Sequence, residues 1–132
     1  MIIDTSALLA IVYNEPEAQA FAHAISLSVG ELRISAATLF ESSIVVDSNK
    51  DPVLSRALDD LIKRSRIIVI PFSDDQAVIA RAAYRDFGKG SGHPAQLNFG
   101  DCFTYALAKA TGEPLMCKGN DFAKTDTLIV EI

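Results

Sequence analysis

Four acidic residues stand where chemistry is expected, and these are Asp4, Glu41, Asp101 and Asp121. Each follows a predicted strand or lies near the start of a predicted apolar helix. Four carboxylates at close range repel one another, so either some of them take up protons or cations neutralise them. Ligands that are all oxygen suit Mg²⁺ or Mn²⁺, and no His or Cys is spaced to recruit zinc.

The reaction that this ligand set predicts is hydrolysis of a phosphodiester. Mg²⁺ keeps several waters and shares its remaining coordination positions with phosphate oxygens. A pair of such ions roughly 4 Å apart can activate water and stabilise the leaving oxygen. The acids therefore predict metal-assisted cleavage of a nucleic-acid backbone.

Asp101 lies in the first turn of the most apolar helix that the sequence predicts. Asn98 is a strong N-cap residue, and Asp101 falls three positions later, as in a capping box. Residues 102–108 are almost all apolar, so most of this helix is expected to be buried. Free N–H groups and the helix dipole favour an ionised acid here. Taken alone, Asp101 could be a simple cap, but the other three acids favour a shared site.

Strand patterns alternate with helix patterns along the whole chain. Helices are predicted after Thr5 or Ser6, which would cap the first of them, and after several later turns. The run Ile67–Ile70 is continuously apolar, which is typical of a parallel strand covered on both faces. The predicted strands are 1–4, 32–35, 67–70, 115–117 and 128–130.

This alternation predicts βαβ units, and so an α/β fold of three layers, α/β/α. Right-handed crossovers place helices on both faces of a central parallel sheet of about five strands. Ligands of such sheets bind beyond the carboxyl ends of the strands. Asp4 and Asp121 follow the first and fourth strands, and the other two acids lie on helices that start at this edge. All four acids are therefore expected to converge.

Composition limits the class of protein. The chain has 132 residues, of which 49% are hydrophobic, and this predicts one folded domain spanning residues 1–132. The net charge of −5 argues against coating nucleic acid through a basic surface, but not against an enzyme that meets it through metal ions. No signal peptide or membrane span is expected, which predicts a cytoplasmic protein. Cys102 and Cys117 are expected to be buried, reduced thiols.

Several motifs together resemble the PIN-domain family, and within it the VapC-type toxins of bacterial toxin–antitoxin pairs. The similar stretches occur in family order and with family-like spacing. They are Met1–Leu8, the helix that carries Glu41, the segment from Gly88 through His93-Pro94-Ala95 to Cys102, and Gly119–Phe122.

This resemblance implies a ribonuclease that uses Mg²⁺ or Mn²⁺, is usually a homodimer and is held inactive by a VapB-like antitoxin. The acidic quartet of the family maps onto Asp4, Glu41, Asp101 and Asp121. Asn98 matches the residue that caps the catalytic helix. The resemblance also implies that Thr5 or Ser6 joins the site through a hydroxyl or a bound water.

Two features stand outside this mapping. Asp126 is either a fifth acid or a surface residue of a turn, and the surface residue is the preferred interpretation. Asp86 and Ser91-Gly92 lie where such toxins are more basic, which bears on RNA affinity and substrate choice but not on the metal site.

A basic stripe offers a candidate contact to RNA. Arg81, Arg85 and Lys89 are spaced at i, i+4 and i+8, on the predicted outer face of the helix before the glycine-rich loop. These residues are predicted to touch phosphates. A solvated helix face explains the same pattern equally well.

Two other classes of protein are alternatives. A receiver-like or haloacid-dehalogenase-like phosphotransfer protein also places acids at strand ends, and Lys118 could act as the receiver lysine. The dehalogenase type requires a second Asp two residues after the first, where this chain has Ser6, and Glu41 has no part in either scheme. The second alternative is a non-catalytic module that binds a metal or a partner.

Overall fold

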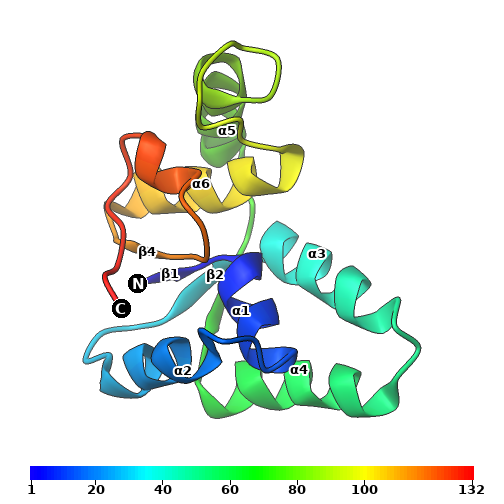
Figure 1. Ribbon diagram of the computed structural model, residues 1–132. Helices are drawn as coiled ribbons and strands as arrows, with labels where there is room; N and C mark the ends of the chain where they lie inside the picture. The colour runs from blue at the N-terminus through cyan, green and yellow to red at the C-terminus, as the bar shows by residue number, and fades with distance from the viewer.

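A computed structural model describes all residues from Met1 to Ile132. The helices pack around a small central sheet, with α5 and α6 on one side of it and α1, α2 and α4 on the other (Figure 1). No helix has the length and apolar character needed to span a bilayer. In chain order the elements are β1 (Ile2–Ile3), α1 (Thr5–Val12), α2 (Ala18–Leu27), β2 (Arg33–Ser35), α3 (Ala36–Asp47), α4 (Pro52–Arg64), β3 (Ile68–Ile70), α5 (Asp74–Phe87), α6 (Phe99–Thr111), β4 (Leu115–Met116) and the 3₁₀ helix η1 (Phe122–Lys124).

The sheet is parallel throughout, in the order β3-β2-β1-β4. The predicted α/β fold with helices on both faces is therefore confirmed, with one strand fewer. The segment predicted as a fifth strand, 128–130, forms only a single parallel bridge, between Leu115 and Ile129. β4 has only two residues, so it offers too short an edge for a longer ladder.

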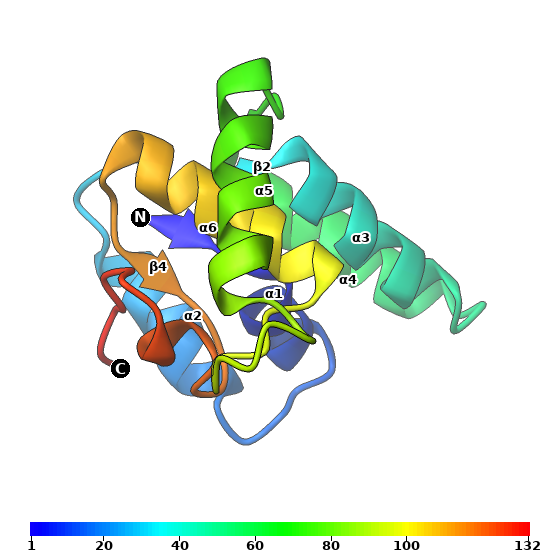
Figure 2. The ribbon, with the colours of Figure 1, turned by 90° about the horizontal axis from the view of Figure 1, so that it is seen from above.

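Residue alternation on the central strands divides the interior into two cores. Ile3 and Met116 contribute to a core built mainly from α1, α2, α3 and α4, whereas Ile2 and Leu115 contribute to a core with α5, α6 and η1. All four of these side chains are fully buried. On the second side, α5 lies across α6 (Figure 2). Both layers therefore hold the central strands, and with them the loops at their ends, in place.

The strand β3 lies at the edge of the sheet, and the prediction that both its faces are covered was wrong. It pairs only with β2. Ile68 and Val69 are 40% and 42% exposed. A continuous apolar run indicates a parallel strand but does not tell whether the strand is central or peripheral.

The starts of the helices are set by short polar side chains. Asp4, rather than Thr5 or Ser6, is the N-cap of α1, and its carboxylate accepts the backbone N–H of Ser6. The predicted capping box of Asn98 and Asp101 at the start of α6 is confirmed. A carboxylate that follows β1 directly thus serves as both strand end and helix cap, and this fixes its position.

Candidate active site

Asp4 is the most buried of the four acids, with 5% of its surface exposed. Its Oδ2 accepts hydrogen bonds from the backbone N–H of Ser6 at 3.0 Å and from the Ser6 hydroxyl at 2.6 Å. Its Oδ1 accepts the hydroxyl of Thr104, on α6, at 2.7 Å. Donors to both oxygens fix the orientation of this carboxylate.

The Ser6 hydroxyl also ties two strand ends together. Its Oγ accepts the backbone N–H of Lys118, which follows β4, at 2.9 Å. One side chain thus links the end of β1 to the segment after β4. The prediction that Ser6 supports the site through its hydroxyl fits this geometry.

Glu41 lies in the second turn of α3 and reaches toward the start of α6. The hydroxyl of Thr5 donates to its Oε1 at 2.6 Å, and Ser42 donates in turn to Thr5 at 3.1 Å. Its carboxylate rests against Gly100, where an added Cβ would overlap the carboxyl oxygens and come within 2.7 Å of Cδ. Only glycine at position 100 leaves room for this arrangement.

Asp101 takes part in the capping box that opens α6. Its carboxylate accepts the backbone N–H of Asn98 at 2.9 Å, and the Asn98 side chain accepts the N–H of Asp101 at 2.8 Å. Burial raises the pKa of Asp101 to about 6, against the opposing effect of the Asn98 N–H. The charges of the other three acids raise this pKa further. Each of the other three carboxylates is therefore close enough to repel that of Asp101.

Asp121 differs from the other three acids because it is exposed and forms no side-chain hydrogen bond. It precedes η1 and lies five residues beyond the end of the two-residue strand β4 (Leu115–Met116). Its charge contributes to the raised pKa of Asp101 and to that of Cys117. Its place beside the other acids therefore depends on the backbone that carries it.

No cation of the protein compensates this cluster. None of the seven ion pairs of the chain includes Asp4, Glu41, Asp101 or Asp121. No three His, Cys, Asp or Glu side chains stand close enough together to enclose an ion. Burial raises the pKa of Cys117 to about 12, which keeps the neighbouring thiol neutral. The available donors are thus carboxylate oxygens alone, a set that fits a hard divalent cation retaining part of its water shell.

Thr104 and Thr38 belong to the site, although the sequence did not single them out. Thr104 is 1% exposed, and its Oγ1 lies 3.2 Å from the Oγ1 of Thr38, on α3. Because Thr104 gives its only hydroxyl proton to Asp4, Thr38 must be the donor in this pair. A chain of hydroxyls thus runs from α3 through α6 to Asp4. The signal was a polar residue one turn after Asp101, within the mostly apolar run 102–108.

The basic stripe is only partly helical. Arg85 is 74% exposed on its side chain and pairs with Asp86 at 2.9 Å. α5 ends at Phe87, so Lys89 lies in the following loop and not at a third helical position. That these residues bind RNA stays a prediction.

His93, Lys118 and Asp126 make contacts outside the acid cluster. The Nδ1 of His93 accepts the N–H of Ala95 at 3.1 Å within the loop before α6. Lys118 Nζ pairs with Glu15 at 2.7 Å. Asp126 accepts hydrogen bonds from Tyr105 and Lys109 on α6.

Gly100→Ala should disturb the acid cluster without unfolding the chain. Alanine favours the helix by about 0.5–1 kcal/mol, but its Cβ would displace the Glu41 carboxylate. We expect Mn²⁺ affinity, measured by calorimetry, to fall on the order of 10-fold. Gly30→Ala, where a Cβ meets nothing within 4 Å, is the matched control. Unchanged Mn²⁺ affinity in Gly100→Ala would show that Glu41 is not held at the site as described.

The pKa of Asp101 predicts how stability varies with pH in the metal-free protein. In the folded chain this pKa is raised from 3.8 to about 6, so protonation of Asp101 favours the folded state. This contribution to the free energy of unfolding is complete below about pH 4 and is lost as the pH rises through 6. Asp101→Asn should therefore raise Tm at pH 7.5, and its advantage should shrink toward pH 5. Asp59→Asn, on an exposed position of α4, controls for net charge. An Asp101→Asn advantage that is the same at both pH values would contradict this account.

Comparisons with known proteins agree with this architecture. The family model of the PIN domain matches residues 1–128. Ribonuclease VapC28 of Mycobacterium tuberculosis is 55% identical over 125 residues, covering 95% of this chain and 93% of the relative.

Two solved structures share the fold. The crystal structure of Mycobacterium tuberculosis VapC20, described as a sarcin-ricin-loop-cleaving toxin, superposes with a TM-score of 0.79 at 14% identity, covering 99% of this chain and 98% of that one. A toxin–antitoxin complex from Klebsiella pneumoniae gives a TM-score of 0.71 at 18% identity, covering 98% and 95%. The sequence match over nearly the whole chain, together with the acids at the carboxyl edge of the sheet, places this chain in the PIN-domain family, among the VapC ribonucleases.

Proposed function

We propose that this protein is a toxin of the VapC type, an endoribonuclease that cleaves RNA by Mg²⁺- or Mn²⁺-assisted hydrolysis, with Asp4, Glu41, Asp101 and Asp121 as its catalytic acids. The observation that carries the proposal is a set of four carboxylates without a cationic partner in the protein, of which Asp4, Glu41 and Asp121 add to the effect of burial in raising the pKa of Asp101. Such a site is complementary to a divalent cation. We propose that this site hydrolyses RNA in the cytoplasm.

The metal would be held by Asp4 and Asp101, with Glu41 and Asp121 completing the ligand set. When bound, the ion would supply Lewis-acid activation of water and neutralise charge on the phosphodiester. The acidic site repels phosphate when it is empty, so binding of RNA is expected to depend on the metal.

The residues of the chain orient the acids before any ligand arrives. Ser6 and Thr104 fix both oxygens of Asp4, and Thr5 holds Glu41. Asn98 holds Asp101 through the capping box. The protein itself thus orients each of these carboxylates, and a bound cation would draw them closer together, because no three of them stand close enough to enclose an ion.

The phosphotransfer alternative has less support from the geometry. The Nζ of Lys118 pairs with Glu15 and Glu17, at 2.7 and 3.2 Å, instead of reaching the acids. A non-catalytic module would not need three of its acids to be individually oriented.

We also propose two macromolecular partners besides RNA. A homodimer follows from the family resemblance. A VapB-like antitoxin is expected to present Arg or Lys to the uncompensated acids, because opposite charges attract strongly where water is scarce.

An apolar hollow of about 320 Å³ lies directly beside Glu41, and its lining includes Phe40, Ile44 and Phe99. We propose that the antitoxin covers this hollow. The related Klebsiella pneumoniae structure is itself a toxin–antitoxin complex.

Asp101→Asn tests the catalytic proposal. The amide preserves size and can still accept the N–H of Asn98, so the fold should survive. Loss of one ligand charge should lower the rate of Mn²⁺-dependent RNA cleavage on the order of 10²-fold or more, because metal and water are both misplaced. Asp4→Asn and Glu41→Gln should behave alike, with little further loss in double variants. Asp59→Asn should cleave normally, and EDTA should abolish cleavage. A folded Asp101→Asn that cleaves at the wild-type rate would refute the mechanism.

Expression with the neighbouring antitoxin gene tests the partner. The two chains should co-elute in size-exclusion chromatography, with stoichiometry and dimerisation read by light scattering. Phe40→Asp should abolish co-elution, since Phe40 is 67% exposed and borders the hollow beside Glu41. Leu27→Asp, at a site 64% exposed at the end of α2, should leave it intact. Persistent co-elution of Phe40→Asp would exclude this surface.

A further inference from the structure

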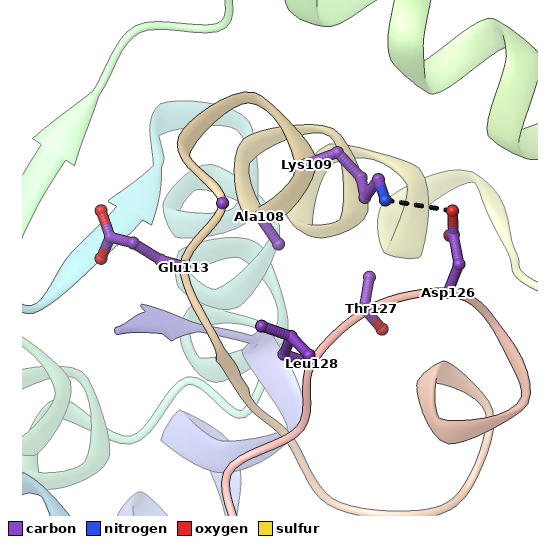
Figure 3. Close-up of a pocket in the computed structure, with 7 residues that line it drawn as sticks. Ala108, Lys109, Glu113, Asp126, Thr127 and Leu128 are labelled. Atoms are coloured by element: carbon purple, nitrogen blue, oxygen red, sulfur yellow. Dashed lines mark hydrogen bonds and ion pairs between the residues drawn. The ribbon is translucent and has the colours of Figure 1, made fainter.

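Asp126 is bound on both of its carboxylate oxygens by α6. The hydroxyl of Tyr105 donates to Oδ1 at 2.6 Å, and Lys109 Nζ donates to Oδ2 at 3.0 Å. Figure 3 shows Lys109 reaching toward Asp126 across a pocket of about 100 Å³ at the end of the helix. Tyr105 and Lys109 are one turn apart, so they lie on the same face of α6. We call this arrangement the Asp126 clamp.

The segment from Asp121 to Asp126 is tied together internally. The carbonyl oxygen of Phe122 accepts the hydroxyl of Thr125 at 2.6 Å, that of Thr127 at 3.1 Å and the N–H of Thr125 at 3.0 Å. The Phe122 ring is only 3% exposed and packs in the core with α6. Movement at one end of this short segment is therefore transmitted to the other.

Asp121 is the acid that most needs such an anchor. Hydroxyl or amide donors orient Asp4, Glu41 and Asp101 directly, but none contacts Asp121. Its carboxylate nevertheless lies within electrostatic range of Asp101. Its position therefore depends on the backbone on either side of it, which is tied to Ser6 at Lys118 and to α6 at Phe122 and Asp126.

We propose that the Asp126 clamp positions Asp121 and keeps its carboxylate close to that of Asp101. Helix α6 carries both Asp101, in its first turn, and the two residues that bind Asp126, which are Tyr105 and Lys109. Asp126 is thus a positioning residue and not a fifth ligand. The inference rests on the proposed function in one respect, namely that Asp121 helps to hold the metal.

Tyr105→Phe tests the inference with Mn²⁺ binding measured by calorimetry. Removing the hydroxyl should weaken Mn²⁺ affinity about 10-fold, the effect typical of losing a group that orients a ligand. In the Asp121→Asn background the same substitution should cause no further loss, because the group that it positions has been neutralised. Tyr13→Phe is the matched control, since Tyr13 also forms a hydroxyl hydrogen bond, with Asn49 at 2.9 Å.

Substitutions at Asp126 separate positioning from simple loss of stability. Asp126→Ala should match Tyr105→Phe, whereas Asp126→Asn, whose amide oxygen still accepts the tyrosine hydroxyl, should retain most of the affinity. These variants also serve if Tyr105→Phe folds poorly. Wild-type Mn²⁺ affinity in Tyr105→Phe and Asp126→Ala would overturn this inference and leave the proposed function intact. An equal loss with and without Asp121 would do the same. No Mn²⁺ binding by the wild-type chain would overturn the proposed function and the inference with it.

Discussion

Mutual repulsion among four carboxylates is the constraint on which the rest of the structure depends. No lysine or arginine relieves it, so the free energy of holding these charges together must come from elsewhere in the fold. Two cores, one on each face of the sheet, supply most of it through apolar burial. Hydroxyl donors then hold Asp4 and Glu41 in fixed orientations. The uncompensated charges lower the stability of the chain but leave a site that attracts a cation.

Helix α6 organises the site along its length. Its first turn carries Asp101, its second carries Thr104 against Asp4, and its remaining turns hold the segment that bears Asp121. Glu41 comes from α3 but packs against Gly100, also on α6. Each of the four acids thus touches or depends on this one helix. Because α6 is buried in the core that it forms with α5 and η1, it holds the residues of the site in fixed positions.

Much of this arrangement could be predicted from local sequence patterns. The end of β1 placed Asp4, and the spacing of Asn98 and Asp101 predicted a capping box that the structure confirms. Asp121 was expected directly after the fourth strand but lies five residues beyond the end of β4. What escaped prediction depends on tertiary contacts. An apolar run does not tell whether β3 is central or at the edge, and a lone Thr104 in an apolar helix gives no sign of its partner. The same holds for Asp126, whose role depends on a tyrosine 21 residues away in sequence.

Gly100 gives the site a particular genetic vulnerability. Every missense change that alters a single nucleotide of a glycine codon introduces a residue with a Cβ, and at this position any Cβ collides with Glu41. The surrounding cores and the outer surface would be left as they are. One base change can therefore displace one carboxylate of the acid cluster while the rest of the folded chain stays as it is.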